Sequence, residues 1–127
     1  CLNHKDGKFD ILYGYDELLL PALAVGAKGA VGSTYNFAAP LYLEMIKKFS
    51  EGHLDEAQRI QLNLVLMIRE MVKYSPIPAQ KAIMRMVGFD LGPCRLPLKC
   101  LTDTERDSLL ANLNKVGFLN NRLFPYV

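Results

Sequence analysis

The chain has 127 residues, half of them apolar, which is enough to bury the hydrophobic core of one small domain. Its net charge of +2, with no basic run that interleaves aromatic residues, excludes a nucleic-acid partner held through phosphate contacts. The longest apolar stretch, 18–27, is too short to span a bilayer, so no membrane partner is expected. No internal repeat or linker divides the sequence, and 1–127 is therefore expected to form a single unit.

The three cysteines, Cys1, Cys94 and Cys100, cannot all pair within one chain. Cys94 and Cys100 flank Pro97 at a spacing that matches no common set of metal ligands. We therefore expect no metal site, and we expect reduced thiols in a cytoplasmic protein. The polar residues that follow Cys1 are typical of the middle of a protein, so we expect the sequence to begin at a truncation boundary.

The first part of the chain alternates short apolar runs with polar loops. Residues 9–13 are expected to form a strand, and Asp16 is expected to cap a helix over 17–25 that ends at Gly26. Residues 29–32 form a second expected strand, whose glycines permit a close backbone approach to a ligand. This order is typical of a parallel α/β protein, in which the loops after the strands carry the chemistry.

From residue 38 onward the pattern becomes helical. Apolar residues recur at intervals of three and four over 38–52 and again over 54–74, which predicts two amphipathic helices. One face of the second helix carries Ala57, Ile60, Leu64, Met67, Ile68 and Met71.

Prolines and a capping signal organise the remaining sequence. A third helix is expected from Pro78, which suits a first turn, to about residue 87. Residues 88–100 are expected to be extended, and Thr102 with Glu105 fits a capping box that opens a last helix.

Asp16 and Glu17 are the candidate site residues that the pattern alone supplies. Adjacent carboxylates at a junction of loop and helix suit hydrogen bonds to several hydroxyls of a polyol or sugar, although their side chains diverge unless the loop turns them together. The same pair also fits an ordinary helix start, with Asp as the cap and Glu favoured by the helix dipole. Likewise, Ser33 by itself belongs only to a polar turn after Gly32.

Three motifs together are more specific. Gly-Tyr-Asp-Glu at 14–17, Gly-Ala-Lys-Gly-Ala-Val-Gly-Ser-Thr-Tyr-Asn at 26–36 and Gly-Pro-Cys-Arg-Leu-Pro-Leu at 92–98 resemble the N-acetylneuraminate lyase family, which are class I sialic acid aldolases. The resemblance covers essentially the whole chain. It implies an α/β fold, the carboxyl-terminal part of a (β/α)8 TIM barrel, with the last two strands and their loops in 1–37 and additional helices in 38–127. The chain itself would then be mostly α-helical.

The resemblance implies reversible cleavage of N-acetylneuraminate to N-acetylmannosamine and pyruvate through a Schiff base, with no metal or cofactor. In that family the imine-forming lysine and a proton-shuttling tyrosine lie on earlier strands, so no catalytic residue is expected in this chain. The isolated chain would be inactive without the rest of the barrel, and the complete protein would be a homotetramer. The family pattern assigns substrate binding to Gly14, Asp16, Glu17 and Ser33.

Two alternatives remain open. One is a related Schiff-base aldolase or synthase of the dihydrodipicolinate synthase type that acts with a different keto acid. The other is a non-catalytic helical fragment that packs on a partner through exposed strand edges and apolar faces. Lys28 and Lys81 are expected on solvated or helix-surface positions in each case.

Overall fold

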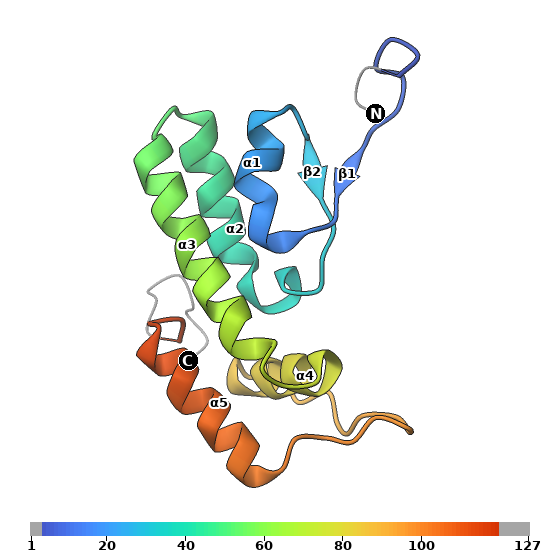
Figure 1. Ribbon diagram of the computed structural model, residues 1–127, viewed down its shortest axis with the longest axis vertical. Coiled ribbons are helices and arrows are strands. Elements are labelled where there is room, and N and C mark those ends of the chain that lie inside the picture. The colour runs from blue at the N-terminus through green and yellow to red at the C-terminus, as the bar shows by residue number, and fades with distance from the viewer. Residues whose placement is uncertain (1–3, 120–127) are drawn as a thin grey trace.

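The computed structural model describes residues 4–119, so residues 1–3, which include Cys1, and residues 120–127 lie outside the description. Two short strands and a short helix are followed by four longer helices (Figure 1). The elements are β1 (Leu12–Tyr13), the 3-10 turn η1 (Asp16–Leu18), α1 (Leu19–Ala24), β2 (Gly29–Ala30), α2 (Tyr35–Ser50), α3 (Leu54–Met71), α4 (Pro76–Met86) and α5 (Asp103–Lys115).

The two strands pair in parallel, as the sequence predicts. Leu12 lies opposite Gly29, and the pairing continues through a hydrogen bond of 2.9 Å from the Val31 N–H to the Tyr13 carbonyl. Both strands are shorter than the expected 9–13 and 29–32. Within residues 4–119 the sheet has only these two strands. The residues before Leu12 therefore have no neighbouring strand to pair with, and β1 stays short.

The helix expected over 17–25 is divided, and its predicted cap is wrong. A 3-10 turn comes first, and the α-helix proper covers only Leu19–Ala24. The N-cap position of the turn is Tyr15, with no side-chain capping bond. Asp16 does not cap because its carboxylate binds Thr34 instead. The predicted end at Gly26 is confirmed, since this glycine adopts a positive φ of 98° that other residues avoid.

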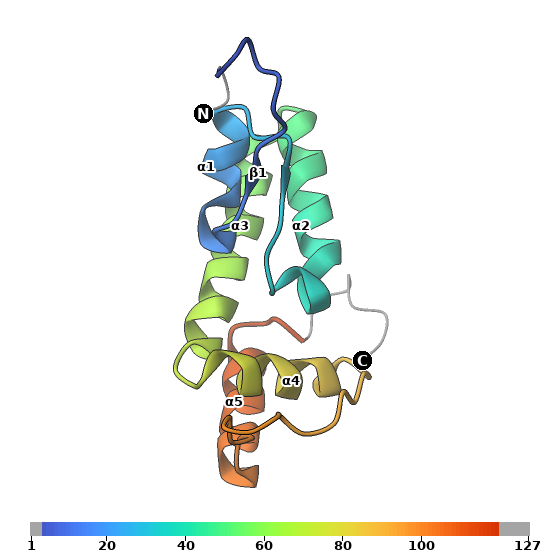
Figure 2. The same cartoon turned by 90° about the vertical axis from the view of Figure 1, so that its right-hand side faces the viewer.

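Helices α2 and α3 form an antiparallel pair that lies, with α1, on one side of the strand pair (Figures 1 and 2). Helix α2 begins at Tyr35 rather than residue 38, because the polar residues after Gly32 already form its first turn. Helix α3 ends at Met71, earlier than predicted. Its predicted apolar face is confirmed: Ala57, Leu64, Met67, Ile68 and Met71 are buried and Ile60 is half-buried.

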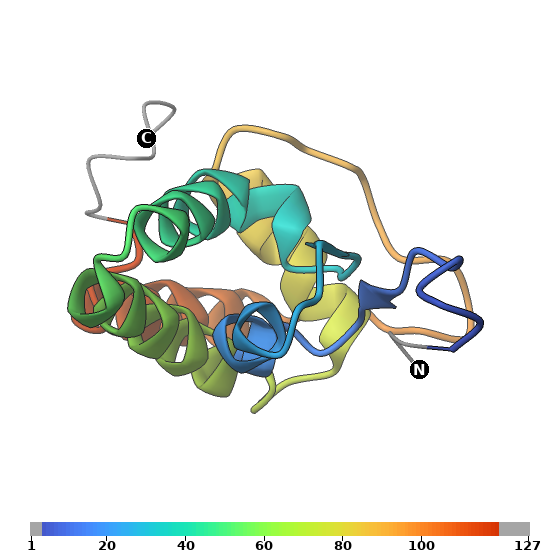
Figure 3. The same ribbon diagram turned by 90° about the horizontal axis from the view of Figure 1, so that it is seen from above.

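Helices α4 and α5 pack against each other and against α3 below the strand pair (Figure 1). Helix α4 begins at Pro76 rather than Pro78, and both prolines are accommodated in its first turn. The predicted capping box of α5 is confirmed, with the Thr102 hydroxyl accepting from the Glu105 N–H and the Glu105 carboxylate accepting from the Thr102 N–H. The segment between α4 and α5 extends away from the helices (Figure 3).

The hydrophobic core lies where the four longer helices meet. Its fully buried large side chains include Met45 from α2, Leu64 from α3, Ile83 from α4 and Leu109 from α5. Over residues 4–119, no helix is both long enough and apolar enough to cross a membrane. The helical part therefore has a core of its own, against which the strand pair and its loops are held.

Candidate functional site

The loops that follow the two strands meet at one end of the sheet. Because β1 and β2 are parallel neighbours, the chain leaves both strands in the same direction, at Gly14 and at Val31. The Asp16 carboxylate from the first loop then reaches Thr34 in the second. Its Oδ2 accepts a hydrogen bond of 3.2 Å from the Thr34 N–H and a second, short one from the Thr34 hydroxyl. A single carboxylate thus joins the two loops.

Gly32 makes this junction sterically possible. Asp16 is only 8% exposed, and its carboxylate lies directly against the Gly32 backbone. A Cβ at residue 32 would fall well within 3.0 Å of both carboxylate oxygens. Gly32 does not have a positive φ, so a side chain is excluded by space rather than by backbone conformation. The close approach expected at these glycines is therefore made to Asp16 of the same chain.

A chain of hydroxyls extends the junction into α2. The Thr34 Oγ1 lies 2.7 Å from the Tyr42 hydroxyl. Since the one proton of Thr34 is donated to the Asp16 carboxylate, the Tyr42 hydroxyl donates to Thr34. Burial raises the pKa of Tyr42 well above its ordinary value, and the Asp16 charge raises it further although the hydrogen bond with Thr34 opposes the shift. Tyr42 therefore stays a neutral donor near neutral pH.

The Tyr35 hydroxyl lies beside this chain of hydroxyls. Its ring packs edge-on against Tyr42, with centroids 4.3 Å apart, and its hydroxyl is buried with no hydrogen-bond partner among residues 4–119. Burial, followed by the nearby Asp16 charge, raises the pKa of Tyr35. The neutral Tyr35 hydroxyl therefore lies close to the Asp16 carboxylate, beside the chain of hydroxyls.

Gln61 fixes the first loop from the opposite side. Its Oε1 accepts from the Leu20 N–H at 2.9 Å, and its Nε2 donates to the Asp16 carbonyl at 3.3 Å. The side chain is 8% exposed and projects from α3. A glutamine on the buried face of an amphipathic helix indicates a buried polar partner nearby. This is the signal from which Gln61 could have been found in the sequence.

Ser33 and Glu17 take different positions around the junction. Ser33 is exposed, and its hydroxyl accepts a hydrogen bond of 2.8 Å from Gln80 Nε2 on α4. Glu17 is half-buried and lines a groove of about 510 Å³ between α1 and α3. The two adjacent carboxylates therefore diverge: Asp16 turns inward to Thr34, and Glu17 turns to the helices.

The structure thus brings Gly14, Asp16 and Ser33 to the same end of the strand pair, with Glu17 beside it. It adds three side chains that hold the junction, which the candidate set from the sequence does not contain. These are Thr34, Tyr42 and Gln61. The sequence offers a signal for Gln61 alone, whereas the contacts of Thr34 with Asp16 and with Tyr42 form only once the loops and α2 have packed.

The chain is similar in sequence and in structure to two kinds of aldolase-type enzyme. The chain is 41% identical over 117 residues to N-acetylneuraminate lyase of Xenopus tropicalis, covering 88% of the chain and 38% of that protein. It is 37% identical over 115 residues to 4-hydroxy-tetrahydrodipicolinate synthase of Methanothrix thermoacetophila, covering 90% and 39%. Among solved structures, Proteus mirabilis N-acetylneuraminate lyase superposes with a TM-score of 0.86 and 42% identity, covering 93% and 40%.

The chain therefore spans about two fifths of the length of these relatives. The model of the dihydrodipicolinate synthetase family matches residues 2–116, which include both strands, the polar junction and all the helices. On this match and these identities, the chain belongs to the dihydrodipicolinate synthetase family.

Proposed function

We propose that this chain is the carboxyl-terminal part of a Schiff-base aldolase that reversibly cleaves N-acetylneuraminate to N-acetylmannosamine and pyruvate. The observation that carries the proposal is the junction of two loops at one end of adjacent parallel strands, closed by Asp16 and Thr34. In a (β/α)8 barrel this end of the strands bears the active site. The identities to N-acetylneuraminate lyases from Xenopus tropicalis and Proteus mirabilis support the choice of substrate.

The exposed strand pair supports an incomplete barrel. Leu12 is 59% exposed and Val31 is 62% exposed, although both belong to apolar runs at the sheet. Earlier strands of a complete protein would pair with the free edges and cover these side chains. Those strands would also supply the imine-forming lysine and the proton-shuttling tyrosine, so the chain alone would be inactive. We propose a cytoplasmic homotetramer for the complete protein.

The residues of this chain would act on the part of the substrate derived from the sugar. The Gly14 carbonyl and the exposed Ser33 hydroxyl would offer hydrogen bonds to substrate hydroxyls. Glu17, whose side chain lines the groove between α1 and α3, would have to turn toward them to add a further acceptor. Asp16 would accept through the carboxylate oxygen that Thr34 leaves free. The imine formed elsewhere would draw electrons from the breaking carbon–carbon bond, while these groups hold the sugar end in position.

A synthase of the dihydrodipicolinate type is the second candidate, and the 37% identity to the Methanothrix thermoacetophila enzyme favours it. Such an enzyme would form the same imine with a keto acid and react it with a short aldehyde. A short aldehyde has few hydroxyls, so it would need fewer hydroxyl-binding groups in the site. Assays of the complete protein with N-acetylneuraminate and with short aldehydes separate the two candidates. Cleavage of N-acetylneuraminate supports the lyase, whereas condensation of pyruvate with only a short aldehyde supports the synthase.

Asp16→Asn tests the sugar-binding role. Asparagine keeps an oxygen for the Thr34 bonds but removes the charge, so kcat/KM for N-acetylneuraminate should fall by about 10- to 100-fold. The rate of imine formation with pyruvate should stay unchanged, because pyruvate carries none of the sugar hydroxyls. Steady-state cleavage and borohydride trapping of the complete protein measure the two quantities.

Asp107→Asn is the matched control, since Asp107 is an exposed carboxylate on α5. It should change neither rate. If the Asp16→Asn protein cleaved N-acetylneuraminate at the unaltered rate, Asp16 would not be a substrate-binding residue. If cleavage and imine formation fell equally, its role would be structural.

A further inference from the structure

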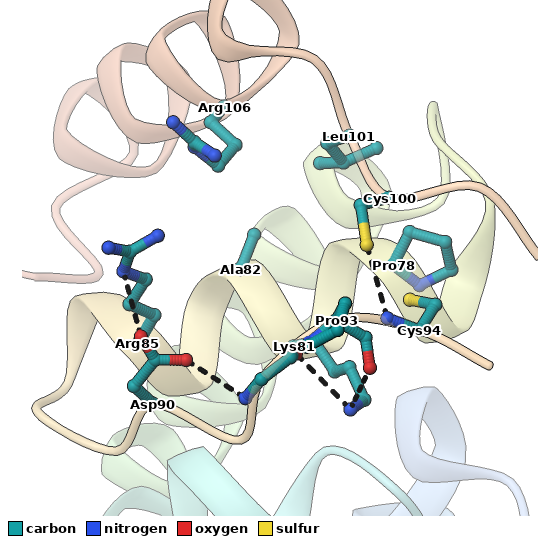
Figure 4. A pocket seen from close by; sticks show the side chains of 11 residues that line it. Pro78, Lys81, Ala82, Arg85, Asp90, Pro93, Cys94, Cys100, Leu101 and Arg106 are labelled. Atoms are coloured by element: carbon teal, nitrogen blue, oxygen red, sulfur yellow. Dashed lines mark hydrogen bonds and ion pairs between the residues drawn. The ribbon is translucent and has the colours of Figure 1, made fainter.

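The segment between α4 and α5 brings two cysteines together outside the polar junction. A turn closed by a hydrogen bond of 3.1 Å from the Leu98 N–H to the Arg95 carbonyl reverses the chain between them. The Cys94 N–H donates to Cys100 Sγ at 3.1 Å, so the two residues are in direct contact. Both are free, and both line a pocket of about 310 Å³ (Figure 4).

Basic side chains line the same pocket as this pair. Lys81 lines the pocket from α4 and holds the segment by donating to the carbonyls of residues 91–93, at 3.0 to 3.3 Å. Arg106 lines it from α5, and Arg85, whose Nε lies 3.5 Å from Asp90, lines it from α4 (Figure 4). Lys81 therefore lies on the surface of α4, which is one of the two positions expected for it, and it is half-buried because it holds this segment.

The surroundings make the two thiols unequal. The Cys94 N–H, helped by the Cys94 thiol and by the charges of Lys81 and Arg106, lowers the pKa of Cys100. Burial, followed by the hydrogen bond with Cys100, raises the pKa of Cys94. Cys100 is also exposed, whereas Cys94 is half-buried. Cys100 is therefore the better nucleophile, and Cys94 is a protonated thiol placed beside it.

We propose that Cys94 and Cys100 form a dithiol site that is oxidised by small anionic disulfides to an intramolecular disulfide. The Cys100 thiolate attacks one sulfur of the reagent, forms a mixed disulfide and releases one thiolate. The Cys94 thiol then attacks Cys100 Sγ, its proton passes to the leaving sulfur, and the second reagent thiol departs. One reagent disulfide is reduced to two thiols and one protein disulfide is formed. Three cationic side chains and one carboxylate, that of Asp90, line the pocket, and this excess of positive charge favours an anionic reagent, of which oxidised glutathione is the probe.

The experiment uses the chain with Cys1→Ser, so that only the two cysteines of this site remain. After incubation with oxidised glutathione, intact mass spectrometry should show the loss of two hydrogens and no retained glutathione, reversed by dithiothreitol. Cys94→Ser in the same background removes the resolving thiol and should leave a stable glutathione adduct on Cys100.

The paired variant Cys100→Ser tests the assignment of the nucleophile. Its remaining Cys94 should react about tenfold more slowly than Cys100 does in the Cys94→Ser chain. Equal rates for the two variants would overturn the assignment of roles. A stable glutathione adduct on the chain that holds both cysteines, without ring closure, would overturn the dithiol site itself. Neither outcome depends on aldolase activity, because the test reads only the thiols.

Discussion

Gly32→Ala is expected to lower the free energy of unfolding by about 2 to 4 kcal/mol. The added Cβ would overlap the Asp16 carboxylate, so either the carboxylate or the loop has to move. Movement of either would break the bonds from Asp16 to the Thr34 N–H and hydroxyl, and these bonds join the two loops. Urea denaturation followed by circular dichroism measures the change.

Gly14→Ala is the matched control in the neighbouring loop. A Cβ there has ordinary space, with the Val31 carbonyl oxygen 3.9 Å away, and Gly14 has no positive φ. Its effect on stability should stay within about 1 kcal/mol, in either direction. Equal destabilisation by both substitutions would mean that the close approach of Asp16 to Gly32 is not what the second loop requires.

Gln61→Leu is expected to lower the free energy of unfolding by about 1 to 3 kcal/mol. Leucine fills a similar volume but leaves the Leu20 N–H buried without an acceptor and removes the donor to the Asp16 carbonyl. The amide of Leu20 should also exchange faster with solvent than in the parent chain. Denaturation and hydrogen exchange of this amide measure the two effects.

Gln58→Leu is the control on the same helix, because Gln58 is exposed one turn earlier in α3. Its effect should stay within about 0.5 kcal/mol, as is usual for surface substitutions. If the Gln61→Leu protein had the same free energy of unfolding as the Gln58→Leu protein, the hydrogen bonds from Gln61 to the first loop would contribute nothing to stability.

The elements that the sequence predicts well are those determined by local pattern. The apolar face of α3 follows from intervals of three and four residues, and the capping box of Thr102 and Glu105 follows from a spacing of three. The parallel strand pair follows from the order of strand, helix and strand. For the helix face and the capping box, the residues that determine the structure are near neighbours in the chain; the strand pairing follows instead from the order of the elements.

The predictions that failed concern contacts between distant residues. Asp16 has the sequence signature of a helix cap, yet its carboxylate is bound by Thr34, eighteen positions away. This contact depends on the packing of two strands and on the space left by Gly32, neither of which is visible around residue 16. Gln61 and Tyr42 likewise reach the junction from α3 and α2 only after the helices have packed.

The thiols show the same dependence on folding. A spacing of six positions around Pro97 matches no metal pattern and says little about pairing. Once the segment after α4 has turned back, the Cys94 N–H points at Cys100 Sγ and Lys81 anchors the backbone next to it. The chemical difference between the two cysteines arises from this arrangement and from the basic residues around it.

We propose that this chain supplies the sugar-binding side of an aldolase whose imine-forming lysine lies elsewhere in the complete protein. Trapping with pyruvate and borohydride, read by peptide mass spectrometry, tests it most directly, because borohydride converts the imine to a stable amine. The prediction is a pyruvate adduct on a lysine outside residues 1–127 of the complete protein, and none on the 127-residue chain alone. An adduct on a lysine of this chain, such as Lys28 or Lys81, or a complete protein that forms no adduct, would contradict the claim.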